Sequence, residues 1–306
     1  MHQTMRPTHD PATTPQTGER LQMSGVQMHP ISKTAFFCCG IRADDARSPG
    51  SIYADIYAED FMTTEGRTIY AQFSGSPRRN ASNVVRARII QDEIAQRLKA
   101  NKNLQIVNIG AGFDSRAYRL AGGRWFEFDE PAIIEHKNAR LTTERCPNPL
   151  QRRAVAFSSG ELPAALRECD PDVETLIVIE GVFMYLDKAQ VDELLQTLSD
   201  RFPSHTLICD LMNRVFFKRH MGKMYDQILA LGSEFKLIEA QPENVFLHRG
   251  YQQPSPPISI VGRARDFKAF RIPDLLLRTA LHTLRDGYRV HAFERSRQDA
   301  ARQPLR

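Results

Sequence analysis

The sequence predicts an α/β protein built on a central, mostly parallel sheet. Short β-branched segments alternate with helix-like segments through the middle of the chain, which is the pattern of right-handed βαβ units. The first strand-like segment runs directly into Gly110-Ala111-Gly112, and the second ends at Asp129, nineteen residues after Gly110. Because parallel strands end at one edge of their sheet, these two features should face a shared ligand site.

The composition is that of an ordinary globular protein. The chain has 306 residues, of which 42% are hydrophobic and 25% are charged. The net charge of +5 comes from scattered basic residues, so nucleic acid is not an expected partner. No apolar stretch is long enough to cross a bilayer, and the first residues lack the apolar core of a secretory signal, so we expect a cytoplasmic protein without a membrane partner. Five cysteines without CxxC spacing predict free thiols and no metal site.

The chain divides into two regions by composition. Residues 1–30 are rich in Thr, Pro, Gln and His and lack apolar periodicity, which predicts a flexible tail. Residues 31–306 are expected to form one domain. Its first clear helix follows Ser82, where apolar residues recur at helical spacing up to the polar run at 99–103.

Strand-like segments rich in β-branched and aromatic residues then follow one another, at 104–109, 125–129, 153–157, 175–180, 206–210 and 288–293. The clearest helix spans about Lys188 to Phe202, where Asp187 and Gln190 predict a capping box. Further helices are predicted over 221–231 and 274–284, on either side of a Pro-rich loop at 253–257.

The glycine loop and the acidic strand end together predict a nucleoside ligand. Glycine permits positive φ and close approach of a ligand, and Asp129 is placed to accept hydrogen bonds from two ribose hydroxyls. A dinucleotide fingerprint would need a third glycine where the chain has Ser115, and Asp114 would oppose a pyrophosphate at the helix N-terminus. S-adenosylmethionine, which carries a sulfonium and no phosphate, fits better than NAD, which stays an alternative.

Three motifs resemble the leucine carboxyl methyltransferase family, which includes protein methyltransferases and bacterial polyketide O-methyltransferases. They are the glycine loop, Glu127-Phe-Asp129-Glu-Pro131 and Glu180-Gly-Val-Phe-Met-Tyr185-Leu, in the family's order and spacing. The resemblance covers about residues 31–293. It implies a Rossmann-like class I methyltransferase fold, in which a mostly parallel seven-stranded sheet is flanked by helices and carries extra N-terminal and C-terminal capping helices. It also implies methyl transfer to an oxygen.

The resemblance further implies which residues bind S-adenosyl-L-methionine. The loop Gly110-Ala111-Gly112 would line the cofactor, Asp129 would bind its ribose, and Glu180 would face its amino-acid end from the fourth strand. Lys33 and Arg86 would reach the methionine carboxylate, because a cation forms strong charge-assisted hydrogen bonds with it. Arg88 is an equal candidate for the role of Arg86.

One position departs from the family. The Asp that usually follows the third strand and binds the adenine amino group is absent, and Ser158 stands there as a weaker partner. An Arg that serves the substrate in protein-methylating members is absent from the same region. These departures leave open a non-catalytic relative with weakened cofactor binding, and they disfavour a protein terminus as the acceptor.

Some of these residues have a structural alternative. Asp129 is also placed to cap the helix that starts near Pro131, and Tyr185 is expected in the core. Candidate bases are His205, His220 and His248, for which spacing alone identifies no partner.

The substrate pocket is expected over the carboxyl ends of the strands. Besides the early helices, its candidate lining residues are Met212, Arg249 and Tyr251, of which the last two suit an anionic or aromatic acceptor.

The sequence therefore predicts an S-adenosyl-L-methionine-dependent O-methyltransferase, of the kind found in secondary metabolism. Its acceptor would be a carboxylate or hydroxyl of a small molecule, such as a polyketide, or of a peptide. No catalytic residue is assigned, because a carboxylate acceptor needs no base whereas a phenol would benefit from one. The alternatives are protein C-terminal carboxyl methylation, a non-catalytic methyltransferase-like protein and, with least support, nucleic-acid methylation.

Overall fold

The computed structural model describes residues 28–73 and 77–297, and only the backbone of residues 77–80. Apart from residues 28–30, the tail predicted for 1–30 lies outside the described residues. Ordered structure was expected from Ile31, and the first helix in fact begins at Pro30, one residue earlier.

Seven strands form one sheet in the order β3-β2-β1-β4-β5-β7-β6. The first five run parallel, whereas β7 runs antiparallel to both of its neighbours. This arrangement confirms the mostly parallel, seven-stranded sheet implied by the family resemblance. The strands are β1 (Gln105–Ile109), β2 (Arg124–Asp129), β3 (Leu150–Ala154), β4 (Thr175–Ile179), β5 (His205–Met212), β6 (Ile258–Ser259) and β7 (Tyr288–Arg295).

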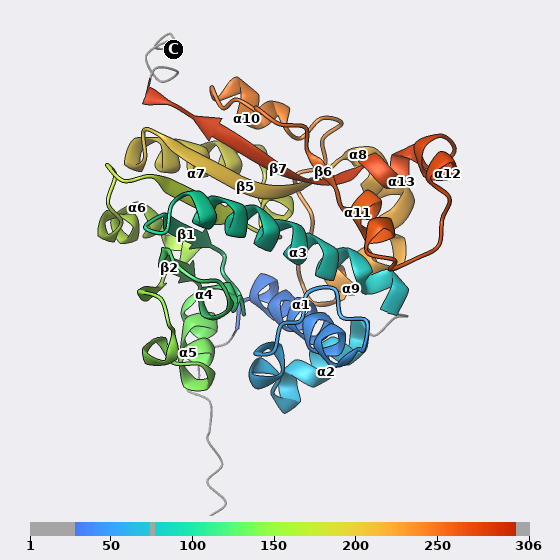
Figure 1. Ribbon diagram of the computed structural model, residues 1–306, viewed down its shortest axis with the longest axis horizontal. Helices are drawn as coiled ribbons and strands as arrows, with labels where there is room; N and C mark the ends of the chain where they lie inside the picture. Colours follow the sequence, from blue (N-terminus) through green and yellow to red (C-terminus); the bar gives the residue numbers. More distant parts are fainter. Residues whose placement is uncertain (1–27, 74–76, 298–306) are drawn as a thin grey trace, which may run out of the picture.

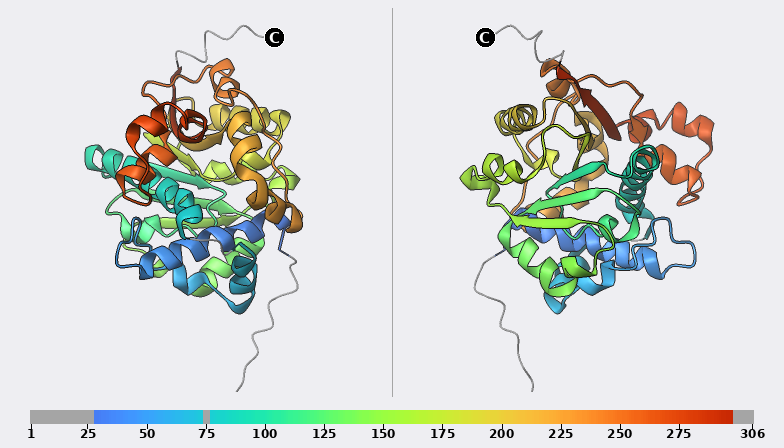
Figure 2. Two further views of the ribbon diagram at one scale, coloured as in Figure 1. Left: turned by 90° about the vertical axis from the view of Figure 1, so that its right-hand side faces the viewer. Right: turned by 60° about the vertical axis from the view of Figure 1, so that its left-hand side comes forward.

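Helices cover both faces of this sheet (Figures 1 and 2). The N-terminal and central helices are α1 (Pro30–Arg47), α2 (Thr64–Phe73), α3 (Pro77–Ala100), α4 (Arg116–Arg119), α5 (Pro131–Arg140), α6 (Leu162–Ala165) and α7 (Lys188–Arg201). The C-terminal helices are α8 (Arg214–Phe216), α9 (Gly222–Ala230), α10 (Asn244–His248), α11 (Ile260–Asp266), α12 (Asp274–Arg278) and α13 (His282–Asp286). Short 3₁₀ turns and a π-helical turn at Phe217–Met221 join some of these elements.

Alternation along the strands divides the apolar residues between two cores. Ile106, Leu176 and Ile208 pack in one core with residues of α1 and α3, whereas their neighbours Val107 and Ile177 pack in the other core with α7. Successive side chains of a strand point to opposite faces, so strands buried on both sides read as unbroken apolar runs. This is why β1 and β4 are recognisable in the sequence.

The third strand lies three residues earlier than predicted. It spans Leu150–Ala154 instead of 153–157, and it pairs in parallel with β2 from Trp125 to Asp129. Its Arg152 is buried and donates from Nε to Glu127 at 2.8 Å. A paired, buried arginine looks like a surface residue in the sequence, and this hid the strand.

The helix predicted over 274–284 is broken into two. Helices α12 and α13 pack against each other, and the chain turns at Thr279 between them. The interruption contains no Gly or Pro, so tertiary packing and not local propensity sets it. The two-residue strand β6 was also not predicted, since so short a segment has no periodicity to detect.

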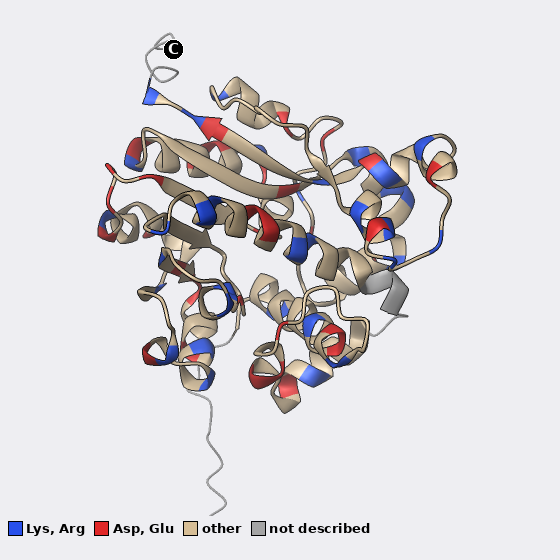
Figure 3. Cartoon of the chain, viewed as in Figure 1, with Lys and Arg blue, Asp and Glu red and all other residues tan. Residues whose placement is uncertain are grey.

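Other local predictions are confirmed. Asp187 and Gln190 form the capping box of α7, with both reciprocal hydrogen bonds present. Helix α9 falls within the predicted segment 221–231. Acidic and basic residues are mixed along the same elements (Figure 3), in agreement with the scattered charge of the sequence. Among residues 28–73 and 77–297, none of the helices has the length and apolar content of a membrane span.

Candidate functional site

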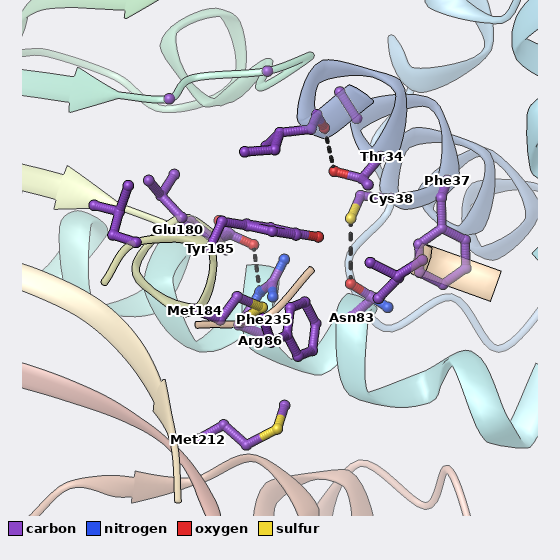
Figure 4. Close-up of a pocket in the computed structure, with 18 of the residues that line it drawn as sticks. Thr34, Phe37, Cys38, Asn83, Arg86, Glu180, Met184, Tyr185, Met212 and Phe235 are labelled. Atoms are coloured by element: carbon purple, nitrogen blue, oxygen red, sulfur yellow. Dashed lines mark hydrogen bonds and ion pairs between the residues drawn. The ribbon is translucent and has the colours of Figure 1, made fainter. Parts of the chain in front are cut away.

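A cavity of about 980 Å³ lies over the carboxyl ends of the parallel strands. The loops after β1, β2, β4 and β5 form its floor, and α1, α3 and the C-terminal helices form its walls. Figure 4 shows side chains from several of these elements pointing toward one space. The volume is near the upper end of the range of roughly 300–1,000 Å³ found for small-molecule sites, which is large enough for more than one small ligand.

The glycine loop after β1 forms one edge of the cavity. Gly110 and Gly112 have φ of 68° and 49°, in the left-handed region that favours glycine. A Cβ on Gly110 would lie 2.5 Å from Cγ2 of Val182, so a side chain there would clash with the turn after β4. Gly110, Ala111 and Gly112 all line the cavity, and their small size leaves the backbone accessible to a ligand.

Asp129 lies beside this loop at the end of β2. Its Oδ2 accepts the Gly112 amide at 2.5 Å and its Oδ1 accepts the Glu130 amide at 2.7 Å. Burial raises the pKa of Asp129 to about 6, against the lowering effect of these two amides. An ionised carboxylate offers about four acceptor sites, so Asp129 retains capacity for hydroxyl donors from the cavity. The N-cap of α5 is Glu130 and not Asp129, which removes the capping alternative.

Glu180 follows β4 and lies between two arginines. Its Oε1 accepts from Nε of Arg86 at 3.0 Å, and its Oε2 pairs with Arg116. Burial raises the pKa of Glu180, but Arg116 and Arg86 outweigh it and hold the pKa below its usual value. Glu180 is therefore a charged, fixed acceptor at the floor of the cavity.

Arg86 links the floor of the cavity to β5 and β7. Its Nη1 donates to Asp210 at 3.2 Å and to the Tyr288 hydroxyl at 2.6 Å. Its Nη2 lies close to Gly181, because a Cβ added to that glycine would be 3.2 Å from this nitrogen. Arg88, the alternative candidate, does not line the cavity; it pairs with Asp92 at 2.8 Å on the outer side of α3. The structure thus selects Arg86 as the arginine that faces the site.

Ser158 lines the cavity as well. It is exposed, in the short turn Phe157–Ser159 after β3. The amide of Phe157 donates to Oε1 of Glu130 at 3.2 Å, which ties this turn to the end of β2. Ser158 and Asp129 therefore border the same part of the cavity.

Three predicted site residues do not line the cavity. Lys33 is half-buried on α1 outside the lining, so its binding to a cofactor stays a prediction. Arg249 pairs with Asp192 of α7 at 2.9 Å, and Tyr251 is buried against His205, whose Nε2 lies 2.9 Å from the hydroxyl. Arg249 and Tyr251 thus lie outside the lining, and their contact with a substrate stays a prediction. Helix α10 packs against α7, and Tyr251 belongs to the core on the face of the sheet that α7 covers.

The candidate histidines also differ in whether they line the cavity. Burial lowers the pKa of His205 to about 4, and its ring nitrogens face Phe202 and Tyr251, which is a structural role. His248 is also absent from the lining, whereas His220 is present. His220 belongs to the π-helical turn before α9 and packs 5.1 Å from the ring of Phe216. Single π-turns of this kind are frequent at functional sites.

Met212 lines the cavity as predicted, and the structure adds polar residues that the sequence did not reveal. They are Thr34 and Cys38 on α1, Asn83 on α3, Tyr185 after β4 and Tyr288 on β7. Tyr185 is buried, as expected of a core residue, but it also borders the cavity. Its position within the third motif was the available signal for this role. The other four lie on elements far apart in the sequence, which only the fold brings together.

In the described part of the chain, His, Cys, Asp and Glu side chains do not gather in a group of three or more suited to a metal ion.

The sequence profile of the leucine carboxyl methyltransferase family matches residues 35–199, which is more than half of the chain. A Mycolicibacterium gilvum protein, named provisionally as an S-adenosyl-L-methionine-dependent methyltransferase, is 31% identical over 188 residues, covering 55% of this chain and 62% of that protein. A Streptomyces avermitilis protein with the same provisional name is 31% identical over 197 residues, covering 59% of this chain and 67% of its own. The chain thus spans about two thirds, or slightly less, of these relatives.

Solved structures share the fold. A DUF574 family protein from Streptomyces avermitilis has a TM-score of 0.56 and covers 87% of this chain and 99% of its own, at 12% identity. A protein from Thermobifida fusca, named provisionally as a methyltransferase, has a TM-score of 0.52 and covers 78% of this chain and 92% of its own, also at 12% identity. At this identity the likeness concerns the fold alone.

Proposed function

Since the chain belongs to the leucine carboxyl methyltransferase family, we propose that it transfers a methyl group from S-adenosyl-L-methionine to an oxygen of its acceptor. The acceptor would be a carboxylate or hydroxyl of a small molecule, such as a polyketide or another natural product, or of a peptide.

The observation that carries the proposal is the meeting of three strand ends in one cavity. The Gly110–Gly112 loop, Asp129 and Glu180 follow β1, β2 and β4, which are adjacent in the sheet and parallel. Ligands of open α/β sheets bind at this edge. A buried carboxylate with spare acceptor sites beside a glycine turn suits a ribose.

Each end of the cofactor would meet a distinct group of residues. Asp129 would accept hydrogen bonds from the ribose hydroxyls, and Ser158 lies where the adenine edge would approach. The loop backbone and Glu180 would hold the amino-acid end, with the Nη2 of Arg86 directed at its carboxylate. When bound, the cofactor supplies a methyl carbon activated by the neighbouring sulfonium.

Negative charge beside the site supports a sulfonium ligand. Asp129 and Glu180 are two carboxylates at the floor of the cavity, and the second is held ionised by its arginine partners. Opposite charges attract strongly where water is partly excluded. The protein's own contribution would be to position the methyl carbon and the acceptor oxygen, because methyl transfer depends mostly on orientation.

A second candidate is a non-catalytic relative that keeps the fold but binds the cofactor weakly. The exposed Ser158, at the position where the family usually has a carboxylate, favours this reading. Protein C-terminal carboxyl methylation receives less support, because the Arg that serves such substrates is missing from the same segment.

Calorimetric titration with S-adenosylmethionine, S-adenosylhomocysteine and NAD tests the proposal. We expect micromolar binding of both sulfur ligands and no binding of NAD. If neither S-adenosylmethionine nor S-adenosylhomocysteine binds, the proposal is overturned and the non-catalytic relative is favoured. Binding of NAD alone would instead indicate a dehydrogenase.

A further inference from the structure

The part of the cavity beyond the glycine loop has an apolar wall built from flexible side chains. Met184, Met212, Met221 and Met224 line it together with Phe216 and Phe235. They come from the turn after β4, from β5, from α8, from the π-helical turn and α9, and from the segment before α10. Figure 4 shows Met184, Tyr185 and Phe235 close together, with Met212 farther along the cavity. Methionine adapts to irregular apolar ligands, so this wall suits a ligand with an apolar body.

The arginines of the cavity are already matched by carboxylates. Arg42 pairs with Asp55 at 3.3 Å, and Arg86 pairs with both Glu180 and Asp210. The third, Arg116, pairs with Asp114 and Glu180. Of these three, Arg86 is assigned to the cofactor in the proposed function. Nη1 of Arg116 is buried without a hydrogen-bond partner, but each of the three guanidinium groups already has a carboxylate partner in the described lining.

The lysines of the lining lie at the opening of the cavity. Lys223 and Lys236 are both exposed, whereas Asp129 and Glu180, which bracket the expected position of the methyl group, are buried or nearly so. A carboxylate brought next to Glu180 would lose hydration and be repelled by that like charge, and its counter-charge would be the sulfonium and not a protein side chain. A neutral hydroxyl meets neither penalty.

On the basis of the proposed function, we propose that the methyl acceptor is an apolar molecule that presents a neutral hydroxyl, of the phenol class, to the reaction centre. The methionine and aromatic wall holds its body, and the paired arginines discriminate against a carboxylate at the reacting position.

The cavity also holds a group able to take the proton of such a hydroxyl. His29 is engaged as the cap of α1, where its Nδ1 accepts the Ile31 amide at 3.3 Å. His220 lines the cavity, and burial and the neighbouring Arg219 lower its pKa, which favours the neutral imidazole that can accept a proton.

Two ligands with the same ring system test the acceptor class. The protein is loaded with S-adenosylhomocysteine and titrated by calorimetry with 1-naphthol and with 1-naphthoate, which differ in the hydroxyl and the carboxylate. We expect 1-naphthol to bind at least ~10-fold more tightly, because an unpaired charge in a partly buried site costs about 1–3 kcal/mol. Equal or tighter binding of 1-naphthoate would overturn the proposal.

A matched pair of variants places the same new charge inside and outside the cavity. Met184→Lys adds a cation to the half-buried wall and should shift the preference toward 1-naphthoate by ~10-fold or more. Leu275→Lys adds it on α12, where the side chain is 75% exposed, and should leave the preference unchanged. Met184→Leu, which keeps the apolar volume, should retain the wild-type preference.

Binding of S-adenosylhomocysteine is measured for every variant and separates the two proposals. If it binds but neither naphthalene ligand does, or if Met184→Lys and Leu275→Lys behave alike, the acceptor proposal is wrong and the proposed function stands. If S-adenosylhomocysteine does not bind the wild-type protein, the proposed function fails as well.

Discussion

The amide of Gly112 donates a hydrogen bond to Oδ2 of Asp129 over 2.5 Å, so the turn after β1 is tied to the end of β2. This contact fixes the carboxylate beside the glycine loop and presents its remaining acceptor sites to the cavity. It also makes the loop and the carboxylate one unit, because moving either would break the bond.

Asp129→Asn should weaken binding of S-adenosylhomocysteine by ~10- to 100-fold. The amide keeps the shape of the side chain but loses the charge, and hydrogen bonds to a charged group contribute about 1.5–3 kcal/mol. Calorimetry measures the change. Asp192→Asn removes a carboxylate on the surface of α7 and serves as the control, with unchanged affinity expected. Wild-type affinity in Asp129→Asn would mean that this carboxylate does not contact the ribose.

Binding of the cofactor should strengthen as the pH rises through the pKa of Asp129, which burial raises to about 6. Ribose hydroxyls donate to the ionised carboxylate, so binding at a pH near 6 must release a proton from it. Titrations from about pH 5 to about pH 7, in two buffers of different ionisation enthalpy, detect both effects. Asp129→Asn should lose the dependence that stems from this group. A pH-independent affinity in the wild-type protein would contradict the assignment.

Arg86→Met should destabilise the protein by about 3–5 kcal/mol, because it leaves Glu180 and Asp210 without their buried partner. Arg88→Met, two residues along α3, removes a half-exposed pair with Asp92, a hydrogen bond to the Ile52 carbonyl and a contact with the Phe267 ring, and should cost less, about 1–2 kcal/mol. Urea unfolding of both variants gives the comparison. Equal losses would show that the network around Arg86 is not what stabilises the floor of the cavity.

Gly110→Ala combines two costs that a control separates. Its left-handed φ costs about 1–2 kcal/mol for alanine, and the clash with Val182 adds roughly 1–3 kcal/mol. Gly160→Ala has a similar φ of 72° but nothing within 4 Å of the new Cβ, so it should show the first cost alone. Adding Val182→Ala to Gly110→Ala should recover part of the second. Thermal unfolding measures the loss of stability in each variant. Equal losses in Gly110→Ala and Gly160→Ala would show that the contact with Val182 adds no cost.

Ser158→Asp should tighten binding of S-adenosylhomocysteine by ~5-fold, because a carboxylate is roughly twice as strong an acceptor as a neutral hydroxyl. Ser159→Asp adds the same charge to the neighbouring residue, which lies outside the lining, and should have little effect. If both variants bind like the wild-type protein, Ser158 does not contact the adenine edge.

Local sequence patterns predicted much of the fold. The unbroken apolar runs of β1 and β4 and the capping box of α7 each rest on interactions within a few residues, so they can be read from the chain directly. Residues that look polar but are buried in pairs were harder to place. Arg152 concealed β3 in this way, and the turn at Thr279 depends on the packing of α12 against α13.

The sequence by itself determined the alternating architecture, the glycine turn and the carboxylates at the ends of β2 and β4, since strand periodicity and turn chemistry are local. Only the tertiary structure placed Arg86 and not Arg88 in the cavity lining, left Arg249 and Tyr251 outside it, and gathered Thr34, Asn83, Met212 and Tyr288 around one cavity. The physical reason is that a side chain's neighbours depend on the face its element presents. Contacts between distant elements set that face, and no spacing in the sequence records them.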